Sequence, residues 1–121
     1  MLRTHMLRLP GAIEDFPFTP EVPVFKISGK MFAYLSPHRV PPMVTLKLDP
    51  IQGQMLRTTY ESVHPGYHMN KDHWNSIDLD GSIDDAELLT WADESYELVV
   101  SKLTRAQKEA LQDSVRAKDA E

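Results

Sequence analysis

The side chains of this sequence that could do chemistry gather in residues 64–81, which read HPGYHMNKDHWNSIDLDG and hold three of the five histidines. Three imidazoles with a nearby carboxylate form a ligand set that transition metals accept. The helical zinc arrangement is excluded here, because Pro65 and Gly66 break any helix between His64 and His68. Nothing in the spacing fixes a third ligand such as His73. We therefore expect no bound metal and no cofactor.

Acid–base or nucleophilic chemistry is a second candidate, because a histidine titrates near neutral pH and Ser76, Asp78 and Ser82 follow closely. A catalytic triad, however, is defined by geometry rather than by proximity in sequence. The sequence has neither a GxSxG elbow nor a glycine-rich phosphate loop. We expect that the chain is not an enzyme.

A structural role explains the same stretch most simply. Trp74 is expected to be buried, Asn70 to form the turn, and His68 and His73 to be hydrogen-bonded within the fold. The least favoured alternative is a small-molecule pocket formed by Tyr67, His68, Asn70, His73 and Trp74.

Composition predicts one globular domain over residues 1–121, with a charged tail from about residue 114. Apolar residues make up 41% and charged residues 26% of the 121 positions, and there is no cysteine for disulfides or thiolate chemistry. The first residues do not resemble a signal peptide, and no apolar stretch approaches the ~18 residues of a membrane-spanning helix. We expect a cytoplasmic protein without a membrane partner.

The formal charge of −5 is unevenly distributed. Residues 1–76 carry eight Lys and Arg against six Asp and Glu, whereas residues 77–121 carry five against twelve. The acidic total disfavours non-specific binding to nucleic acid, which comes from neutralising phosphates. A local basic face on the first part stays open, and its candidates are Lys26, Lys30, Arg39, Lys47 and Lys71.

The elements that position these residues can be read from periodicity and from start and stop signals. A short helix beginning near Leu2 ends at Pro10-Gly11, and residues 14–21 form a proline-rich loop whose Phe16 and Phe18 fill the edge of the core. Ser28-Gly29 predicts a hairpin of strands at about 22–27 and 30–35. The remaining elements are a strand at 43–48, a helix capped by Asp49 that ends near Thr59, two strands within 62–79, a helix at about 83–102 capped by Ser82, and a last helix opened by a Thr104/Gln107 capping box.

These elements predict an α+β fold in the order α-β-β-β-α-β-β-α-α. The connections between consecutive strands are too short for parallel crossovers, so we expect an antiparallel sheet of about five strands with the helices packed on one face. Alternation places Phe25 and Ile27 on one face of their strand, and Val24 and Lys26 on the other. It also points Val44, Leu46 and Leu48 inward, leaving Thr45 and Lys47 outward.

Four segments together closely resemble the MmcQ/YjbR family: VFKISGKMFAYL, LKLDP, PGYHMNKDHWNSIDLDGSI and DESYELVVSKLT. The similarity extends from Leu9 to near Leu111 and includes an HxNKxHW core that begins at His68. It implies a small α+β domain similar to secretion chaperones and to the CyaY-like class. The family is usually described as DNA-binding with a double-winged arrangement, which extends to this chain by analogy of fold.

Three functional hypotheses follow. The leading one is a DNA-binding or regulatory domain in which Lys26, Lys30, Lys47, Lys71 and Arg39 contact phosphates. The second is a protein-interaction module that uses a face or an edge of the sheet. The third is the small-molecule pocket around Tyr67, His68, His73 and Trp74.

Overall fold

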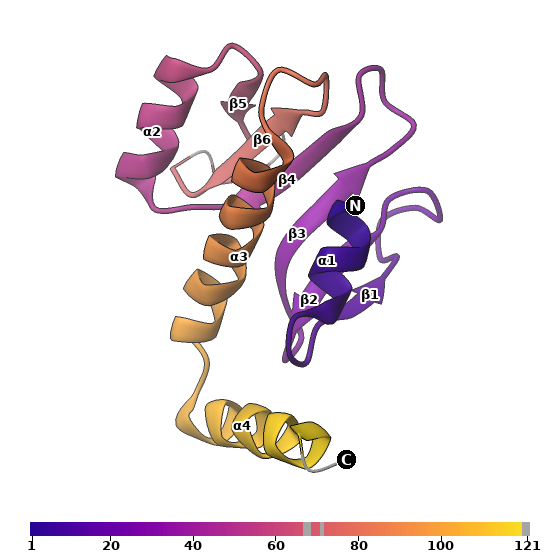
Figure 1. Cartoon of the computed structure of the whole chain (residues 1–121), viewed down its shortest axis with the longest axis vertical. Coiled ribbons are helices and arrows are strands. Elements are labelled where there is room, and N and C mark those ends of the chain that lie inside the picture. Colours follow the sequence, from indigo (N-terminus) through magenta and orange to yellow (C-terminus); the bar gives the residue numbers. More distant parts are fainter. Residues whose placement is uncertain (67–68, 71, 120–121) are drawn as a thin grey trace.

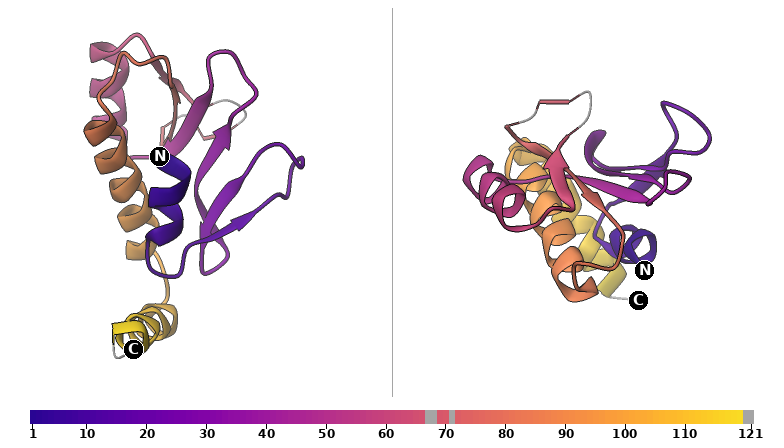
Figure 2. Two further views of the ribbon diagram at one scale, coloured as in Figure 1. Left: turned by 45° about the vertical axis from the view of Figure 1, so that its right-hand side comes forward. Right: turned by 90° about the horizontal axis from the view of Figure 1, so that it is seen from above.

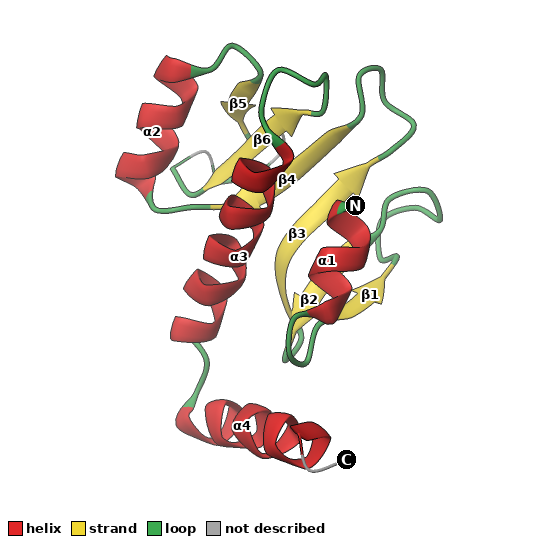
Figure 3. Ribbon diagram, viewed as in Figure 1, coloured by secondary structure: helices red, strands yellow, loops and turns green. Residues whose placement is uncertain are grey.

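The fold is a six-stranded antiparallel sheet with four helices, as the computed structural model shows for residues 1–66, 69–70 and 72–119 (Figures 1 and 3). The strand order across the sheet is β1-β2-β3-β4-β6-β5. The elements are α1 (Leu2–Arg8), β1 (Ile13–Asp15), β2 (Val24–Ile27), β3 (Lys30–Ser36), β4 (Met43–Lys47), α2 (Pro50–Thr59), β5 (Val63–Pro65), β6 (Trp74–Asp78), α3 (Asp85–Ser101) and α4 (Arg105–Asp119). The predicted α+β class and antiparallel pairing are confirmed.

The helices are arranged asymmetrically about the sheet. α3 packs on β2, β3 and β4, α1 packs on α3, and α2 contacts β5 at the far edge. Figure 2 shows α1 and α3 on the same side of the sheet, with α4 beyond the end of α3. α4 is helical to Asp119, past the start expected for the charged tail. No helix in the described part of the chain is long and apolar enough to cross a bilayer.

The alternation predicted for the strands is confirmed. Phe25 and Ile27 lie in the core between sheet and helices, as do Val44, Leu46 and Leu48. The opposite face is less open than expected, because Thr45 is fully buried there.

The sixth strand was missed by the sequence analysis. β1 pairs with β2, with Ile13 opposite Lys26, and the Lys26 Nζ donates to Asp15 Oδ2 over 2.9 Å. β1 is only three residues long and is followed closely by Pro17, so its sequence shows no alternation that would predict a strand. The expectation for the aromatic residues beside it was wrong: Phe16 is 47% exposed and Phe18 63% exposed, so neither fills the core edge.

The predicted helix caps have mixed outcomes. Asp49 accepts the backbone N–H of Ile51 and caps α2, and Thr104 and Gln107 form the reciprocal capping box before α4, over 3.0 and 3.1 Å. Ser82 does not cap α3, because its hydroxyl bonds to Asp80 and Ser62 instead. α3 begins three residues later, at Asp85.

β3 contains one extra residue relative to β2. Phe25 lies opposite Ala33, but the next residue, Lys26, lies opposite Met31. Phe32 is therefore unpaired in a β-bulge, which locally changes the direction of side chains along the strand. As a result, Phe32 and Ala33 are both fully buried in the core beneath the helices.

A single hydroxyl group from α3 completes the hydrogen bonding at this bulge. Ser95 Oγ donates to the carbonyl oxygen of Phe32 over 2.5 Å and accepts the backbone N–H of Lys47 over 2.8 Å. Ser95 and Phe32 are fully buried, so the Phe32 carbonyl has no access to water, and Lys47 is half-buried. The Ser95 hydroxyl thus stands in for a direct bond between β3 and β4 and fastens α3 to both strands.

Replacing Ser95 by alanine should lower the free energy of unfolding by about 1 to 3 kcal/mol, because the buried Phe32 carbonyl and the Lys47 N–H both lose their partner. Ser101→Ala is the matched control, since its exposed hydroxyl bonds only locally to Leu98 and the change should stay within about 0.5 kcal/mol. Urea denaturation of both variants measures the difference. Equal stabilities would show that the bulge does not depend on Ser95.

Trp74→Ala should destabilise the fold by about 3 to 5 kcal/mol, the usual range for truncating a large buried aromatic side chain. Trp74 is 9% exposed, and a Cβ atom added at Gly66 would lie 2.6 Å from the Trp74 Cβ, so the backbone at Gly66 lies directly against the base of this residue. Ile51→Ala, at a 71% exposed position, serves as control and should change stability by no more than about 0.5 kcal/mol. A Trp74→Ala loss as small as that of the control would contradict the packing described here.

Candidate binding groove

The face of the sheet turned away from α3 contains a groove of about 920 Å³. Six apolar side chains line it: Phe18, Val22, Tyr34, Met43, Pro65 and Met69. Four polar side chains complete the lining: Ser36, Arg39, His64 and Ser76. They come from four strands and three connecting loops, so the groove depends on the whole sheet rather than on one motif.

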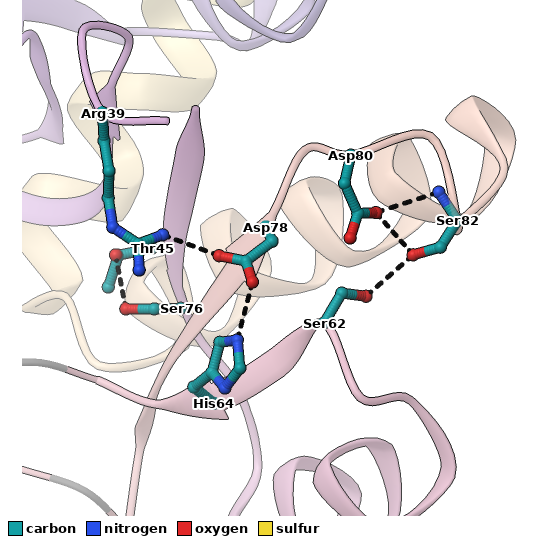
Figure 4. Close-up of polar contacts among 8 residues, drawn as sticks. All are labelled: Arg39, Thr45, Ser62, His64, Ser76, Asp78, Asp80 and Ser82. Atoms are coloured by element: carbon teal, nitrogen blue, oxygen red, sulfur yellow. Dashed lines mark hydrogen bonds and ion pairs between the residues drawn. The ribbon is translucent and has the colours of Figure 1, made fainter. Parts of the chain in front are cut away.

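The floor of the groove is a pair of hydroxyl groups on neighbouring strands. Thr45 on β4 lies opposite Ser76 on β6, and their side-chain oxygens are 2.9 Å apart (Figure 4). The exposed fractions of the two residues are 0% and 2%. Each hydroxyl carries one proton, and a single bond joins them, so one proton remains to be donated elsewhere whichever oxygen accepts.

The rim carries a cluster of three charged or titratable groups. Arg39 Nη1 donates to Asp78 Oδ1 over 2.7 Å, and His64 Nε2 lies 2.8 Å from Asp78 Oδ2 (Figure 4). Asp78 is the most enclosed, with a side chain 16% exposed against 46% for Arg39 and 45% for His64. Partial burial raises the pKa of Asp78, but the hydrogen bonds from His64 and Arg39 together outweigh it and hold that pKa below its usual value.

Of the cations predicted from sequence, four lie among the described residues, and three of these already contact other groups of the protein. Arg39 is paired with Asp78 and Lys26 with Asp15, whereas the Lys30 Nζ reaches the backbone oxygen of Lys102 over 3.4 Å. Lys30 begins β3 and Arg39 follows its other end, so the length of that strand, about 20 Å at 3.3 Å per residue, lies between them. Lys47 projects from the groove face, two residues after Thr45. Lys71 lies outside the described residues.

The residues of the predicted small-molecule pocket also have separate outcomes. Trp74 is buried and Asn70 makes the turn, its Oδ1 accepting the N–H of Asp72 over 2.9 Å, so both structural expectations are confirmed. His73 is half-buried, and its carbonyl oxygen accepts the N–H of Leu48 over 2.7 Å. Tyr67 and His68 lie outside the described residues. Among described residues, no three His, Asp or Glu side chains are arranged to hold a metal ion.

The sequence analysis named Ser76 and the orienting Asp78 only as candidates for acid–base chemistry. Other groove residues were not singled out at all, namely Val22, Tyr34, Ser36, Met43 and Met69. One signal was available for Ser76: like Thr45, it is a small polar residue beside an inward-facing apolar residue of its strand, Ile77 for Ser76 and Val44 for Thr45. That pattern indicates a second sheet face with its own chemistry. Phe18 was expected to fill the edge of the core, whereas it lines the groove and contacts Tyr34 edge-to-face at 6.4 Å between ring centres.

The stability supplied by Asp78 should depend on pH with a definite sign. Because the folded-state pKa of Asp78 is lower than its unfolded value of about 3.8, its contribution is full above that value and is lost as the pH falls through the folded pKa. Asp78→Asn should therefore be less stable than the wild type near neutral pH and approach it in acid. Urea denaturation of both proteins from about pH 7 down to about pH 2 tests this. A constant difference between them across that range would contradict the assignment.

Comparison with known proteins places this fold in a family. The chain is 41% identical over 99 residues to the uncharacterized protein YbdF of Escherichia coli O157:H7, covering 82% of this chain and 81% of that relative. It is 29% identical over 110 residues to the uncharacterized protein YjbR of Escherichia coli K12, covering 91% and 93%.

Solved structures show the same architecture. The crystal structure of Deinococcus radiodurans protein DR2400 matches with a TM-score of 0.86 at 37% identity, over 92% of this chain and 85% of that one. A Pseudomonas syringae protein matches with a TM-score of 0.68 at 25% identity, over 78% and 92%. The YjbR family model matches residues 7–98, a range that includes the bulge, Ser95 and every residue that lines the groove. The chain therefore belongs to the YjbR family.

Proposed function

We propose that this protein is a non-enzymatic binding domain whose ligand surface is the open face of the sheet. The observation that carries the proposal is the groove of about 920 Å³, lined mainly by apolar side chains with a few polar groups. Sites that hold ligands have this character, in which apolar surface supplies affinity and sparse polar groups supply orientation. The opposite face is covered by α1 and α3.

The hydrogen bonding in the groove supports a binding role more than a catalytic one. His64 Nε2 is directed to Asp78, whereas the Ser76 hydroxyl is bonded to Thr45. A serine nucleophile needs a base within hydrogen-bond reach of its own oxygen. The present arrangement instead resembles a fixed set of donors for a bound group.

DNA is the first macromolecular ligand to test, because Lys26 and Lys47 project from the same face as the groove and Arg39 stands at its rim. Phosphate neutralisation by these side chains would supply the affinity. The ion pairs limit that contribution: Lys26 and Arg39 each already hold a carboxylate, and the net charge is −5. Lys47 is then the strongest described candidate for a phosphate contact, and Lys71 stays a candidate from sequence.

Lys47→Gln should weaken DNA binding at low salt and reduce the slope of log affinity against log salt by about one, the effect of losing one phosphate contact. Titration with a short duplex and with its separate strands, at two salt concentrations, measures this. Lys108→Gln on α4 is the charge-matched control, since Lys108 is exposed on a helix remote from the groove face, and it should leave the slope unchanged.

Two results would count against the hypothesis of DNA binding. If Lys47→Gln and Lys108→Gln behave alike, Lys47 is not a phosphate contact. If the wild type has no salt-sensitive affinity even at low salt, DNA should be abandoned in favour of a protein partner on the same face. Ligand-induced changes in amide chemical shift on α1 and α3, rather than on β3, β4 and β6, would overturn the open-face proposal with either ligand.

A further inference from the structure

We infer that the groove binds a small amphipathic organic anion, with its apolar body against Phe18, Tyr34 and Met43 and its anionic head group between Arg39 and Ser76. The inference rests on the proposed use of the open sheet face and specifies a ligand class for it. It is carried by the size of the groove, by the division of apolar and polar lining, and by the direction of the hydrogen-bond donors.

The groove has room for such a ligand. Its volume of about 920 Å³ lies within the range of about 300 to 1,000 Å³ common for small-molecule sites. The wall toward the proline-rich loop is aromatic, since Phe18 packs edge-to-face on Tyr34. Phe18 is nevertheless 63% exposed, a large apolar surface that a ligand in the groove would cover.

The polar groups that line the groove are mainly donors, although a carboxylate belongs to the same cluster. Arg39, His64 and Ser76 line it, whereas Asp78 is not among its described lining residues. Asp78 accepts from Arg39 and His64 through different oxygens. Its role is thus to fix the two side chains that the ligand would meet.

Arg39 keeps most of its hydrogen-bonding capacity in this arrangement. A guanidinium carries five N–H donors, and only the bond from Nη1 joins it to Asp78. The remaining donors suit a carboxylate or sulfonate, because planar, charge-assisted contacts of this kind are the strong ones. The Asp78 charge offsets part of the cationic field, which favours a monoanion over a more highly charged phosphate group.

The hydroxyl pair on the floor adds a further donor. Either oxygen of the Thr45–Ser76 pair can donate their shared hydrogen bond, and when Thr45 donates it, the proton of Ser76, the member that lines the groove, is available to a ligand. A head group that accepts from both Ser76 and Arg39 would be held at two points. The apolar body would then extend toward Phe18.

Two fluorescent probes of nearly the same shape test the ligand class. Anilinonaphthalene sulfonate is an amphipathic anion, and N-phenylnaphthylamine has the same aromatic body without the sulfonate. Arg39→Gln should lower the affinity for the sulfonate probe about tenfold, as expected for a lost charge-assisted contact. It should change the affinity for the neutral probe by no more than about twofold. Phe18→Ala should weaken both probes, because it removes apolar surface common to the two complexes.

Arg105→Gln is the matched control, since Arg105 is also an arginine paired with a carboxylate, Glu109, but lies on α4. It should leave the affinity for both probes unchanged. Circular dichroism and urea denaturation establish that each variant is folded. Probe-induced changes in the amide chemical shifts of Tyr34, Thr45 and Ser76 in the wild type establish where the probe binds.

The outcomes separate this inference from the proposed function. Three results would each overturn the anion site. The first is an equal loss of affinity for both probes in Arg39→Gln, and the second is an equal effect of Arg39→Gln and Arg105→Gln. The third is a set of probe-induced chemical-shift changes on α1 and α3. If neither probe binds although DNA or a protein shifts the sheet face, the small-anion inference fails and the open-face proposal stands. If both probes bind the groove with the predicted selectivity, the inference is supported independently of any macromolecular partner.

Discussion

The hydrogen bonds of the buried Ser95 hydroxyl are the constraint on which the rest of this structure depends. They satisfy the carbonyl of Phe32 and the N–H of Lys47, two groups at the place where β3 departs from regular pairing. An unpaired buried backbone group is costly, so the bulge needs a partner from outside the sheet. Since that partner belongs to α3, the position of the helix and the register of the strands are set together.

The bulge in turn decides which side chains face the groove. Strict alternation along β3 would place Tyr34 on the same side as Phe32, beneath the helices. Because the extra residue directs both Phe32 and Ala33 into the core, Tyr34 is directed to the open face, where it meets Phe18. The neighbouring Tyr96 strengthens this arrangement: it packs edge-to-face on Phe32 and donates to the carbonyl of Pro10, and burial raises its pKa to about 12. The SYELV segment thus acts through Ser95 and Tyr96 as a structural motif.

Sequence was a good guide to the elements and a poor one to the site, for a physical reason. Turns, caps and core alternation depend on neighbouring residues, so the Ser28-Gly29 hairpin, the Asp49 cap and the inward side chains of β4 were predictable. The bulge depends on a residue more than sixty positions away, and β1 forms only because β2 offers an edge. Similarly, the sequence identified Arg39 and Lys26 as cations but could not show that Asp78 and Asp15 accompany them.

These ion pairs change how the charges on the open face should be understood. A free arginine at a rim would attract any anion, including the many phosphates of nucleic acid, whereas one held by Asp78 offers oriented donors with a reduced net charge. Asp78 is itself positioned by β6, directly across from Met43 on β4, so the orientation of Arg39 is tied to the same sheet register that places Thr45 opposite Ser76. The donors at the rim and on the floor therefore keep a fixed relation to one another, and selectivity for a ligand's head group follows from that geometry rather than from the overall charge of the protein.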